Sequence, residues 1–253
     1  MTAFCIYIQC SRFGNSYFYM YPESKGRKGA DEVSLFLYHF VHNFLTPEVG
    51  HLGIFCDSCG GQIKNATVFR FLHHLVHTEK RLDYVKMTFL IRGHLYLECD
   101  KNIDMIDQTQ ECQIPKDWCQ VFQNSHTHAL PFVIIDVEEQ PEIIKCWTEH
   151  LDNTIYKKKL PFQSRPIREL EVTRHHAALV RYRGSYNGAY EQASLLLRGK
   201  KGQDSSLKDG EFSLPSAKYE GDLKISAEKY RDLQDLKRFC HSEVQVYFDH
   251  LWH

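Results

Sequence analysis

One stretch decides the fold: His51-Leu-Gly-Ile-Phe-Cys-Asp57-Ser-Cys-Gly60-Gly61-Gln62-Ile-Lys64-Asn65. Its apolar first part predicts a short buried strand over 52–55, which delivers Asp57 at its end. A Gly-Gly turn follows, and a helix rich in aromatic and histidine residues is predicted over 66–78. An acid at the carboxyl end of a strand lies where α/β folds place their chemistry. The stretch therefore predicts an α/β protein with Asp57 in its functional site.

Polar donors follow the two glycines. Glycine lets a backbone or a phosphate approach closely, because it has no Cβ. Gln62, Lys64 and Asn65 then present donors at the start of a helix, where anions bind readily. The stretch is typical of half of a carboxylate metal site that acts on nucleic acid.

A second cluster follows the next strand, which is predicted over 84–91. Residues 93–107 contain His94 and four acids, namely Glu98, Asp100, Asp104 and Asp107. Two-metal phosphoryl transfer needs several carboxylates around two ions, and Mg²⁺ or Mn²⁺ prefers such oxygen ligands. The alternative is an acidic, solvated helix face, and spacing alone does not decide between the two.

The remaining pattern alternates strands and helices. The first part predicts a hairpin over 4–10 and 16–21 and a helix over 31–45 that Asp31 caps, before the elements already described. This order indicates a mixed sheet with helices on its faces. From Pro115 the pattern becomes α+β, so we expect a core over 1–114 and an extension over 115–253. The extension is predicted to contain these elements: helices over 118–124, 141–156, 226–239 and 244–252, a strand over 131–137, and short strands within 167–198.

Composition limits the class of protein. The chain has 253 residues, 43% hydrophobic and 25% charged, which is ordinary for a globular protein. We expect no membrane span and no secretory signal. Nine scattered cysteines favour reduced thiols, and hence the nucleus or the cytoplasm over secretion. The Cys56-x-x-Cys59 pair and the His73/His77 pair at i, i+4 are weak zinc candidates, since a packed histidine is far more common.

Charge is distributed unevenly. Residues 157–201 contain 11 basic and three acidic side chains. Such a segment suits a polyanion, and we expect Arg181 and Arg183 to contribute to salt-dependent DNA binding. Solvated charge on strands and loops is the equal alternative.

Four motifs resemble one family. Cys56–Asn65 is close to a D-N-C-G-G-Q-N-K-N pattern, and 88–100 is close to F-x-x-x-G-H-S-x-x-x-x-D. Residues 27–33 are similar to an R-G-x-N-E-V helix start, and 225–233 to I-S-x-x-K-x-x-D-L. By these motifs residues 4–107 and the tail resemble the transposase-derived RNase H-like (DDE-type) domain of animals.

The resemblance implies a fold and a set of acids. It implies an RNase H-like mixed sheet in which Asp57 is the second of three metal-binding acids. Asp100 is the first choice for the third acid, with Asp107 as its rival, and His94 would orient a carboxylate or a phosphate. Mg²⁺ or Mn²⁺ would then be bound by Asp57 and Asp100.

The resemblance also implies a DNA partner. Gln62, Lys64 and Asn65 would hold the DNA backbone near the cut. The resemblance leaves open whether the protein forms a homo-oligomer. The implied activity is metal-dependent DNA cleavage and strand transfer.

The chain departs from the family pattern in three places. Its opening hairpin resembles the second and third strands of the sheet, so we expect the strand with the first acid before Met1. Leu95 stands where the family has serine, and Asp107 where it has glutamate. Residues that act as a unit fail together, so the alternative is an inactive remnant that binds nucleic acid or another partner.

Overall fold

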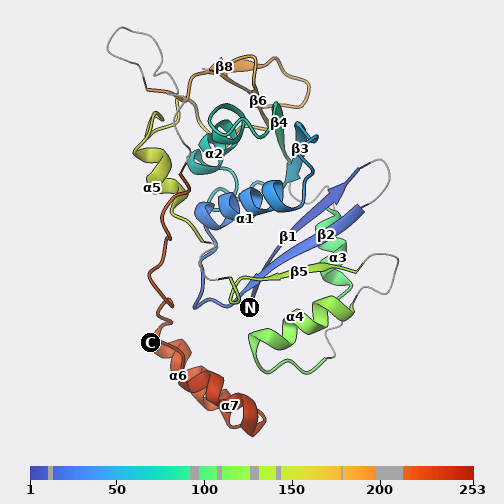
Figure 1. Cartoon of the computed structure of the whole chain (residues 1–253), viewed down its shortest axis with the longest axis vertical. Coiled ribbons are helices and arrows are strands. Elements are labelled where there is room, and N and C mark those ends of the chain that lie inside the picture. The colour runs from blue at the N-terminus through green and yellow to red at the C-terminus, as the bar shows by residue number, and fades with distance from the viewer. Residues whose placement is uncertain are drawn as a thin grey trace. The chain divides into compact units, whose positions relative to one another are not determined.

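The computed structural model describes residues 1–10, 14–91, 97–106, 110–125, 131–140, 144–177, 179–197 and 213–253. These residues form a mixed α/β structure with two sheets, so the α/β class is confirmed (Figure 1). The elements follow in this order: β1 (Thr2–Gln9), β2 (Gly14–Tyr21), α1 (Ala30–Asn43), β3 (His51–Cys56), α2 (Ala66–His77), β4 (Tyr84–Phe89), α3 (Glu98–Asp104), α4 (Pro115–Asn124), β5 (Val133–Asp136), α5 (Trp147–Asp152), β6 (Glu169–Thr173), β7 (Val180–Arg183), β8 (Glu191–Ala193), α6 (Ala227–Lys237) and α7 (Ser242–Asp249).

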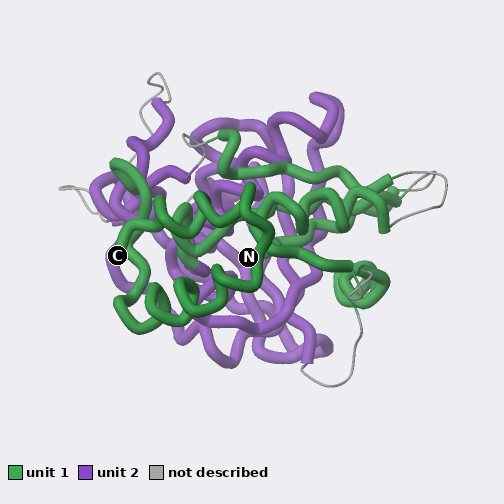
Figure 2. Tube along the Cα trace, turned by 90° about the horizontal axis from the view of Figure 1, so that it is seen from below, with its two compact units in different colours: residues 1–27, 96–143, 219–253 green, residues 28–95, 144–218 purple. Residues whose placement is uncertain are grey.

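The chain divides into two compact units, each built from separate segments (Figure 2). Unit 1 contains residues 1–27, 96–143 and 219–253, and unit 2 contains 28–95 and 144–218. The division differs from the expected boundary at residue 114. The reason is strand pairing: β5 joins β2 in unit 1, and β6 joins β4 in unit 2, so each unit needs segments from both halves of the chain.

Unit 1 contains a three-stranded sheet in the order β1-β2-β5. The predicted hairpin is present, with β1 antiparallel to β2, while β5 is parallel to β2. Aromatic packing against α4 closes the core: the Phe18 ring lies 5.0 Å from the rings of both Phe122 and Phe132, edge to face. Such contacts stabilise a core beyond the area they bury.

Unit 2 contains a five-stranded sheet in the order β3-β4-β6-β7-β8, in which β3 and β4 are parallel. Side chains alternate between its faces, as strand geometry requires. The inner face is fully buried at Val85, Met87, Phe89, Leu170 and Val172. Helix α2 contacts β4 and β6 with an apolar stripe at helical spacing (Val68, Phe69, Leu72, Leu75 and Val76), each 0% exposed. The predicted helix over 66–78 is therefore confirmed.

Two predicted element boundaries are wrong. Gly29, and not Asp31, occupies the N-cap position of α1. Asp31 lies in the first turn of the helix, where its carboxylate accepts hydrogen bonds from the backbone N–H (2.6 Å) and the hydroxyl (2.8 Å) of Thr148. Helix α5 is shorter than expected and ends at Asp152, because the chain then turns so that Tyr156 can pair with Leu196.

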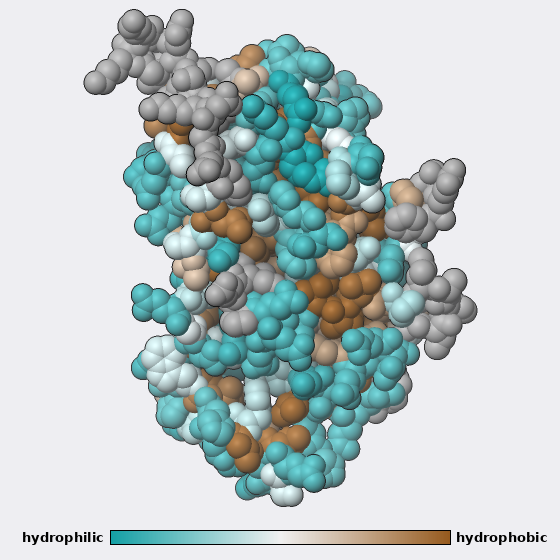
Figure 3. Space-filling view, in the orientation of Figure 1, coloured by the Kyte–Doolittle hydropathy of each residue, from teal (hydrophilic) through white to brown (hydrophobic). Residues whose placement is uncertain are grey.

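Other sequence-based expectations concern the surface and the thiols. None of the described helices combines the length and the apolar character that a membrane crossing needs. All nine cysteines are free thiols. On the face drawn in Figure 3, hydrophilic residues predominate and hydrophobic ones lie in several separate areas.

Candidate functional site

Asp57 lies immediately after β3, at the carboxyl end of the parallel β3–β4 pair. The next residues bind the end of β4: Leu90 N–H donates to the Cys56 carbonyl (2.9 Å), and the Ser58 hydroxyl donates to the Leu90 carbonyl (3.2 Å). Asp57 itself is exposed, and one carboxylate oxygen accepts from Cys59 N–H at 3.4 Å. Within the described ranges no cation forms an ion pair with it. Its carboxylate is therefore open to solvent and to a ligand.

Asn65 organises the loop that follows Asp57. Its side-chain oxygen accepts from Val68 N–H (3.1 Å) and so caps α2, while its amide donates to the carbonyls of Gly60 (3.2 Å) and Gln62 (3.1 Å). Such a cap contributes about 1 kcal/mol. Asn65 therefore has a structural role in this loop.

Lys64 is also used internally. It is 4% exposed, its ammonium donates to the Arg165 carbonyl at 2.8 Å, and it lies 4.8 Å from the centre of the Phe89 ring. Burial, and then the positive charge of Arg168, lower the pKa of Lys64. The Lys64 ammonium therefore fixes the 164–168 segment at this edge. The Gln62 side chain differs, because it is half-buried and has no hydrogen-bond partner within the described part of the chain.

Arg165 and Arg168 complete the edge. The Arg168 carbonyl accepts from Phe89 N–H (2.8 Å), so the segment before β6 runs along the end of β4. Arg165 is exposed and Arg168 half-buried, and neither forms an ion pair with any residue that the structure describes. We call this group the carboxyl edge; it comprises Asp57–Asn65, Phe89, Leu90 and Arg165–Arg168.

The sequence analysis placed Arg165 and Arg168 in the basic segment but did not place them beside Asp57. A signal was available: an Arg-Pro-Ile-Arg run directly precedes a predicted strand. Because β6 is antiparallel to β4, its beginning meets the end of β4. The position of Arg165 and Arg168 beside the end of β4 follows from the pairing of β6 with β4, which the sequence does not show.

The two glycines of the edge border open space. A Cβ built on Gly60 or Gly61 would have no atom within 4 Å. The fold itself therefore leaves room for the close approach of a ligand that the sequence predicted.

Arg181 and Arg183, predicted to bind DNA, lie on the outer face of the unit 2 sheet. Arg183 pairs with Glu169 at 2.5 Å, and Arg181 pairs with Glu171 at 3.5 Å. Both guanidinium groups also lie 4.5 Å from the centre of the Tyr190 ring. Their charges are thus compensated within the sheet, unlike those of Arg165 and Arg168.

The second acidic cluster is described only in part. Asp100 is exposed and accepts from Leu97 N–H at 2.9 Å, which stabilises the start of α3. His94 and Asp107 lie outside the described residues. Asp57 belongs to unit 2 and Asp100 to unit 1, so each is described within its own unit.

No metal-binding cluster is present among the described residues. They contain no group of three or more His, Cys, Asp or Glu side chains that could hold a metal ion. Asp57 supplies one exposed carboxylate at the carboxyl edge.

The histidines of α2 have structural partners. One ring nitrogen of His73 lies 3.0 Å from the Tyr156 hydroxyl, and the other lies 2.7 Å from the Ala177 carbonyl. Burial lowers the pKa of His73 to about 3 and that of His77 to about 4. These observations favour packing over zinc binding for the pair.

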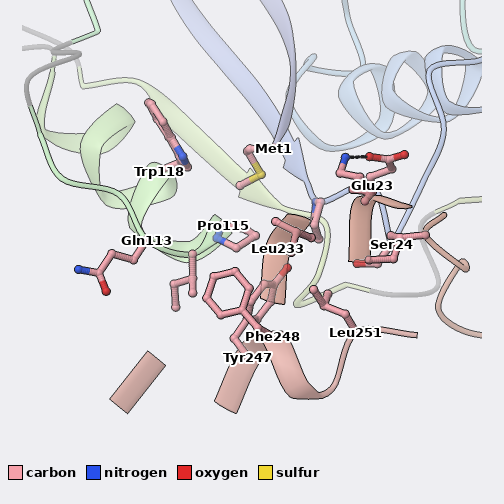
Figure 4. Close-up of a pocket in the computed structure, with 14 residues that line it drawn as sticks. Met1, Glu23, Ser24, Gln113, Pro115, Trp118, Leu233, Tyr247, Phe248 and Leu251 are labelled. Carbon is pink, nitrogen blue, oxygen red and sulfur yellow. Dashed lines mark hydrogen bonds and ion pairs between the residues drawn. The ribbon is translucent and has the colours of Figure 1, made fainter. Parts of the chain in front are cut away.

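A cavity of about 190 Å³ lies in unit 1 (Figure 4). Trp118, Leu233, Phe248 and other apolar side chains line most of it. Lys229 forms an ion pair with Glu23 at its wall. Because these charges compensate each other, the lining offers no uncompensated charge to select a ligand.

The fold and the carboxyl edge define a mixed α/β protein with an exposed acid at one sheet edge, where Arg165 and Arg168 form no ion pair with any described residue. Residues 35–161 match the model of a family described as a domain of unknown function (DUF7869), and the chain belongs to this family. The matched range includes both Asp57 and Asp100. No curated protein and no solved structure matches the chain.

Proposed function

We propose that this chain is a transposase-derived, RNase H-like protein that binds DNA through the carboxyl edge of unit 2. One observation carries the proposal: Arg165 and Arg168 lie beside the loop after Asp57, and neither has an acidic partner among the described residues. Cations without an internal partner are those that can neutralise phosphates and release counterions.

The order of elements supports the RNase H-like part of the proposal. A hairpin is followed by helix, strand, helix and strand, and β3 and β4 are parallel with α2 as their crossover. Among the described residues the hairpin and the β3–β4 pair belong to separate sheets, so the proposal rests on the order of the elements and not on one common sheet.

The loop after Asp57 supports the DNA-binding part. Gly60 and Gly61 leave open space, and the Gln62 amide has no other partner in the described ranges. A phosphate could therefore approach the loop while Arg165 and Arg168 neutralise it. Lys64 and Asn65 would act indirectly, by holding the segments that carry these groups.

Salt-dependent binding tests the proposal. The affinity for fluorescein-labelled DNA is measured by anisotropy between about 50 and about 200 mM NaCl. We expect the affinity to fall steeply with salt, and the Arg165→Ala/Arg168→Ala variant to bind more weakly with a slope smaller by about 1–2. The matched control is Lys158→Ala/Lys159→Ala, which removes two exposed charges beside Asp152 and α2.

Two results would contradict the proposal. One is an affinity that does not depend on salt. The other is an equal loss in both double variants, which would indicate a general effect of charge instead of a site at the carboxyl edge.

A second candidate function is the metal-dependent DNA cleavage and strand transfer that the resemblance implies. The exposed position of Asp57 at the end of β3 favours it. The described carboxylates do not form a metal site, so we derive no catalytic step. Nicking of supercoiled plasmid with Mn²⁺ tests this candidate: activity that Asp57→Ala abolishes supports it, and activity equal in both proteins rejects it.

A further inference from the structure

Unit 1 contains two neighbouring thiols, Cys5 in β1 and Cys99 in the first turn of α3. They are 94 positions apart in the chain, yet the Cys99 thiol donates to the Cys5 carbonyl oxygen at 3.6 Å. The two side chains also hydrogen bond to each other. By contrast, the thiols of Cys119 and Cys146 donate to carboxylates, at 3.8 and 3.5 Å. Cys5 and Cys99 are therefore placed to react with each other.

The fold holds this pair together through other contacts of α3. Asn102 lies three residues after Cys99 on the same face of the helix, and its amide donates to the Ser16 hydroxyl at 2.7 Å. Asn102 is 7% and Ser16 1% exposed, so this hydrogen bond is shielded from water. The Ser16 hydroxyl in turn hydrogen bonds to the Cys5 side chain. The two sulfur atoms are thus brought together in the reduced protein.

The two thiols differ in how readily they ionise. A hydrogen bond from the Cys5 thiol lowers the pKa of Cys99; burial opposes this effect, and a hydrogen bond from the Tyr7 backbone N–H supports it. The same thiol–thiol hydrogen bond raises the pKa of Cys5, and burial raises it further. Because the thiolate is the reactive form, Cys99 is the nucleophile and Cys5 the thiol held in reserve.

A small oxidant has access to both thiols. Cys5 and Cys99 each keep part of their surface exposed, whereas Cys56 and Cys119 are buried. Reactive cysteines combine such partial exposure with thiolate character and often lie beside a second thiol that resolves the oxidised form. The pair in unit 1 meets all three conditions.

We propose that Cys99 and Cys5 form a peroxide-sensitive modification site, in which Cys99 reduces a small hydroperoxide and Cys5 then closes a disulfide with it. In the first step the Cys99 thiolate attacks the terminal peroxide oxygen. The O–O bond breaks, Cys99 becomes a sulfenic acid, and water or an alcohol leaves after taking up a proton. In the second step the Cys5 sulfur attacks the Cys99 sulfur, and the Cys5 proton leaves with the hydroxyl group as water.

The balance is two electrons. Two thiols are oxidised to one disulfide while one hydroperoxide is reduced, and a dithiol reductant reverses the change. The disulfide would bind the first turn of α3, which also carries Asp100, to β1. The inference does not rest on the proposed DNA binding, because both cysteines belong to unit 1 and the carboxyl edge belongs to unit 2.

Peptide mapping of the full chain tests the proposal. The protein is treated with hydrogen peroxide, the remaining thiols are blocked with iodoacetamide, and tryptic peptides are identified by mass spectrometry. Trypsin releases Cys5 and Cys10 in peptide 1–12 and Cys99 in peptide 93–101. We expect a disulfide between these two peptides within one chain, and its loss on treatment with dithiothreitol.

Cys10→Ser is the matched control. Cys10 is exposed and lies in the same tryptic peptide as Cys5. Because Cys5 is the sole thiol of peptide 1–12 in this variant, an undiminished link to peptide 93–101 assigns the bond to Cys5 and Cys99. A Cys10→Ser protein that lacks the link would overturn the proposal, as would a Cys99 linked in similar yield to several other thiols.

Cys5→Ser tests the order of the two steps. Serine keeps a hydroxyl donor for Cys99 but forms no disulfide, so the sulfenic acid should persist and react with dimedone at Cys99. A dimedone adduct absent from Cys99 in the folded variant would contradict its role as the nucleophile. If Cys5→Ser fails to fold, the link in Cys10→Ser still decides whether the pair is the modification site.

Discussion

Unit 2 carries two groups of arginines that look alike in the sequence and differ in the structure. Arg181 and Arg183, on the outer face, are paired with Glu171 and Glu169 and stack on Tyr190. Arg165 and Arg168, at the carboxyl edge, have no acidic partner in the part of the chain that is described. The first pair neutralises charge within the sheet, and only the second pair leaves charge for a ligand. A count of basic residues therefore overstates the charge that a protein can offer to DNA.

The comparison predicts that changes on the outer face affect stability, and changes at the carboxyl edge affect binding. Glu169→Ala should have the largest effect. Glu169 is 5% exposed, and its removal leaves Arg183, Lys86 and the Tyr190 hydroxyl without their shared acceptor. Breaking a buried pair on one side is strongly destabilising, so we expect the free energy of unfolding in urea to fall by about 3 kcal/mol.

The control for this prediction is Glu191→Ala on strand β8 of the same sheet. Glu191 is exposed and accepts a hydrogen bond from the Tyr182 hydroxyl at 3.1 Å. Its loss should change stability by less than about 0.5 kcal/mol. Equal effects of the two variants would show that the outer-face network does not stabilise the sheet.

Acid should have the next largest effect, through the buried histidines of α2. The pKa of His73 is lowered to about 3 and that of His77 to about 4, from an ordinary value of 6.5, mainly by burial. The unfolded chain therefore takes up protons first as pH falls, so stability is fully present above the unfolded pKa and is lost below it. Between about pH 7 and about pH 5 we expect the free energy of unfolding to fall by about 2 kcal/mol for each histidine ring that stays neutral in the folded state.

Urea unfolding at several pH values checks this loss. Unfolding energies that do not change between these pH values would contradict the assignment of His73 and His77 as buried, neutral side chains.

Local patterns predicted most elements of the fold, and the pairing of distant segments was not predictable. The helix over 66–77 follows from an apolar stripe with Asn65 before it, and both parts of that signal are local. The pairing of β5 with β2 joins residues over 100 positions apart, and nothing local encodes it. Because of this long-range pairing, the two units differ from the domain boundary that was expected at residue 114.

The candidate site was predictable to a similar extent. Asp57 at a strand end was predicted correctly from the sequence, because strand, acid and glycines are adjacent. The family resemblance implies DNA contacts for Lys64 and Asn65, but the sequence does not show the carbonyl and N–H groups that these two side chains bind within the fold. The compensation of Arg181 and Arg183 depends on Glu169 and Glu171 lying opposite them, which only the strand register determines.

A smaller effect is expected from Asp57→Asn. The change removes one negative charge at the carboxyl edge and keeps the size of the side chain. In the absence of divalent cations, affinity for DNA should rise about two- to fivefold, as expected for one screened charge near a phosphate site. Anisotropy titrations at low salt measure the change, and unchanged or weaker binding would place the DNA away from Asp57.

The smallest effect is expected from Arg181→Gln/Arg183→Gln, which tests the comparison most directly. Both guanidinium groups already bind carboxylates and the Tyr190 ring, so a phosphate would have to displace these partners. We therefore expect DNA affinity to change by less than about twofold, well below the loss from Arg165→Ala/Arg168→Ala. Stability should fall instead, because Glu169 and Glu171 lose their arginine partners and keep Lys86 and the Tyr190 hydroxyl. If the two double variants lost equal affinity in the same titration, internal pairing would not decide which arginines bind DNA, and the basic segment would act as a whole.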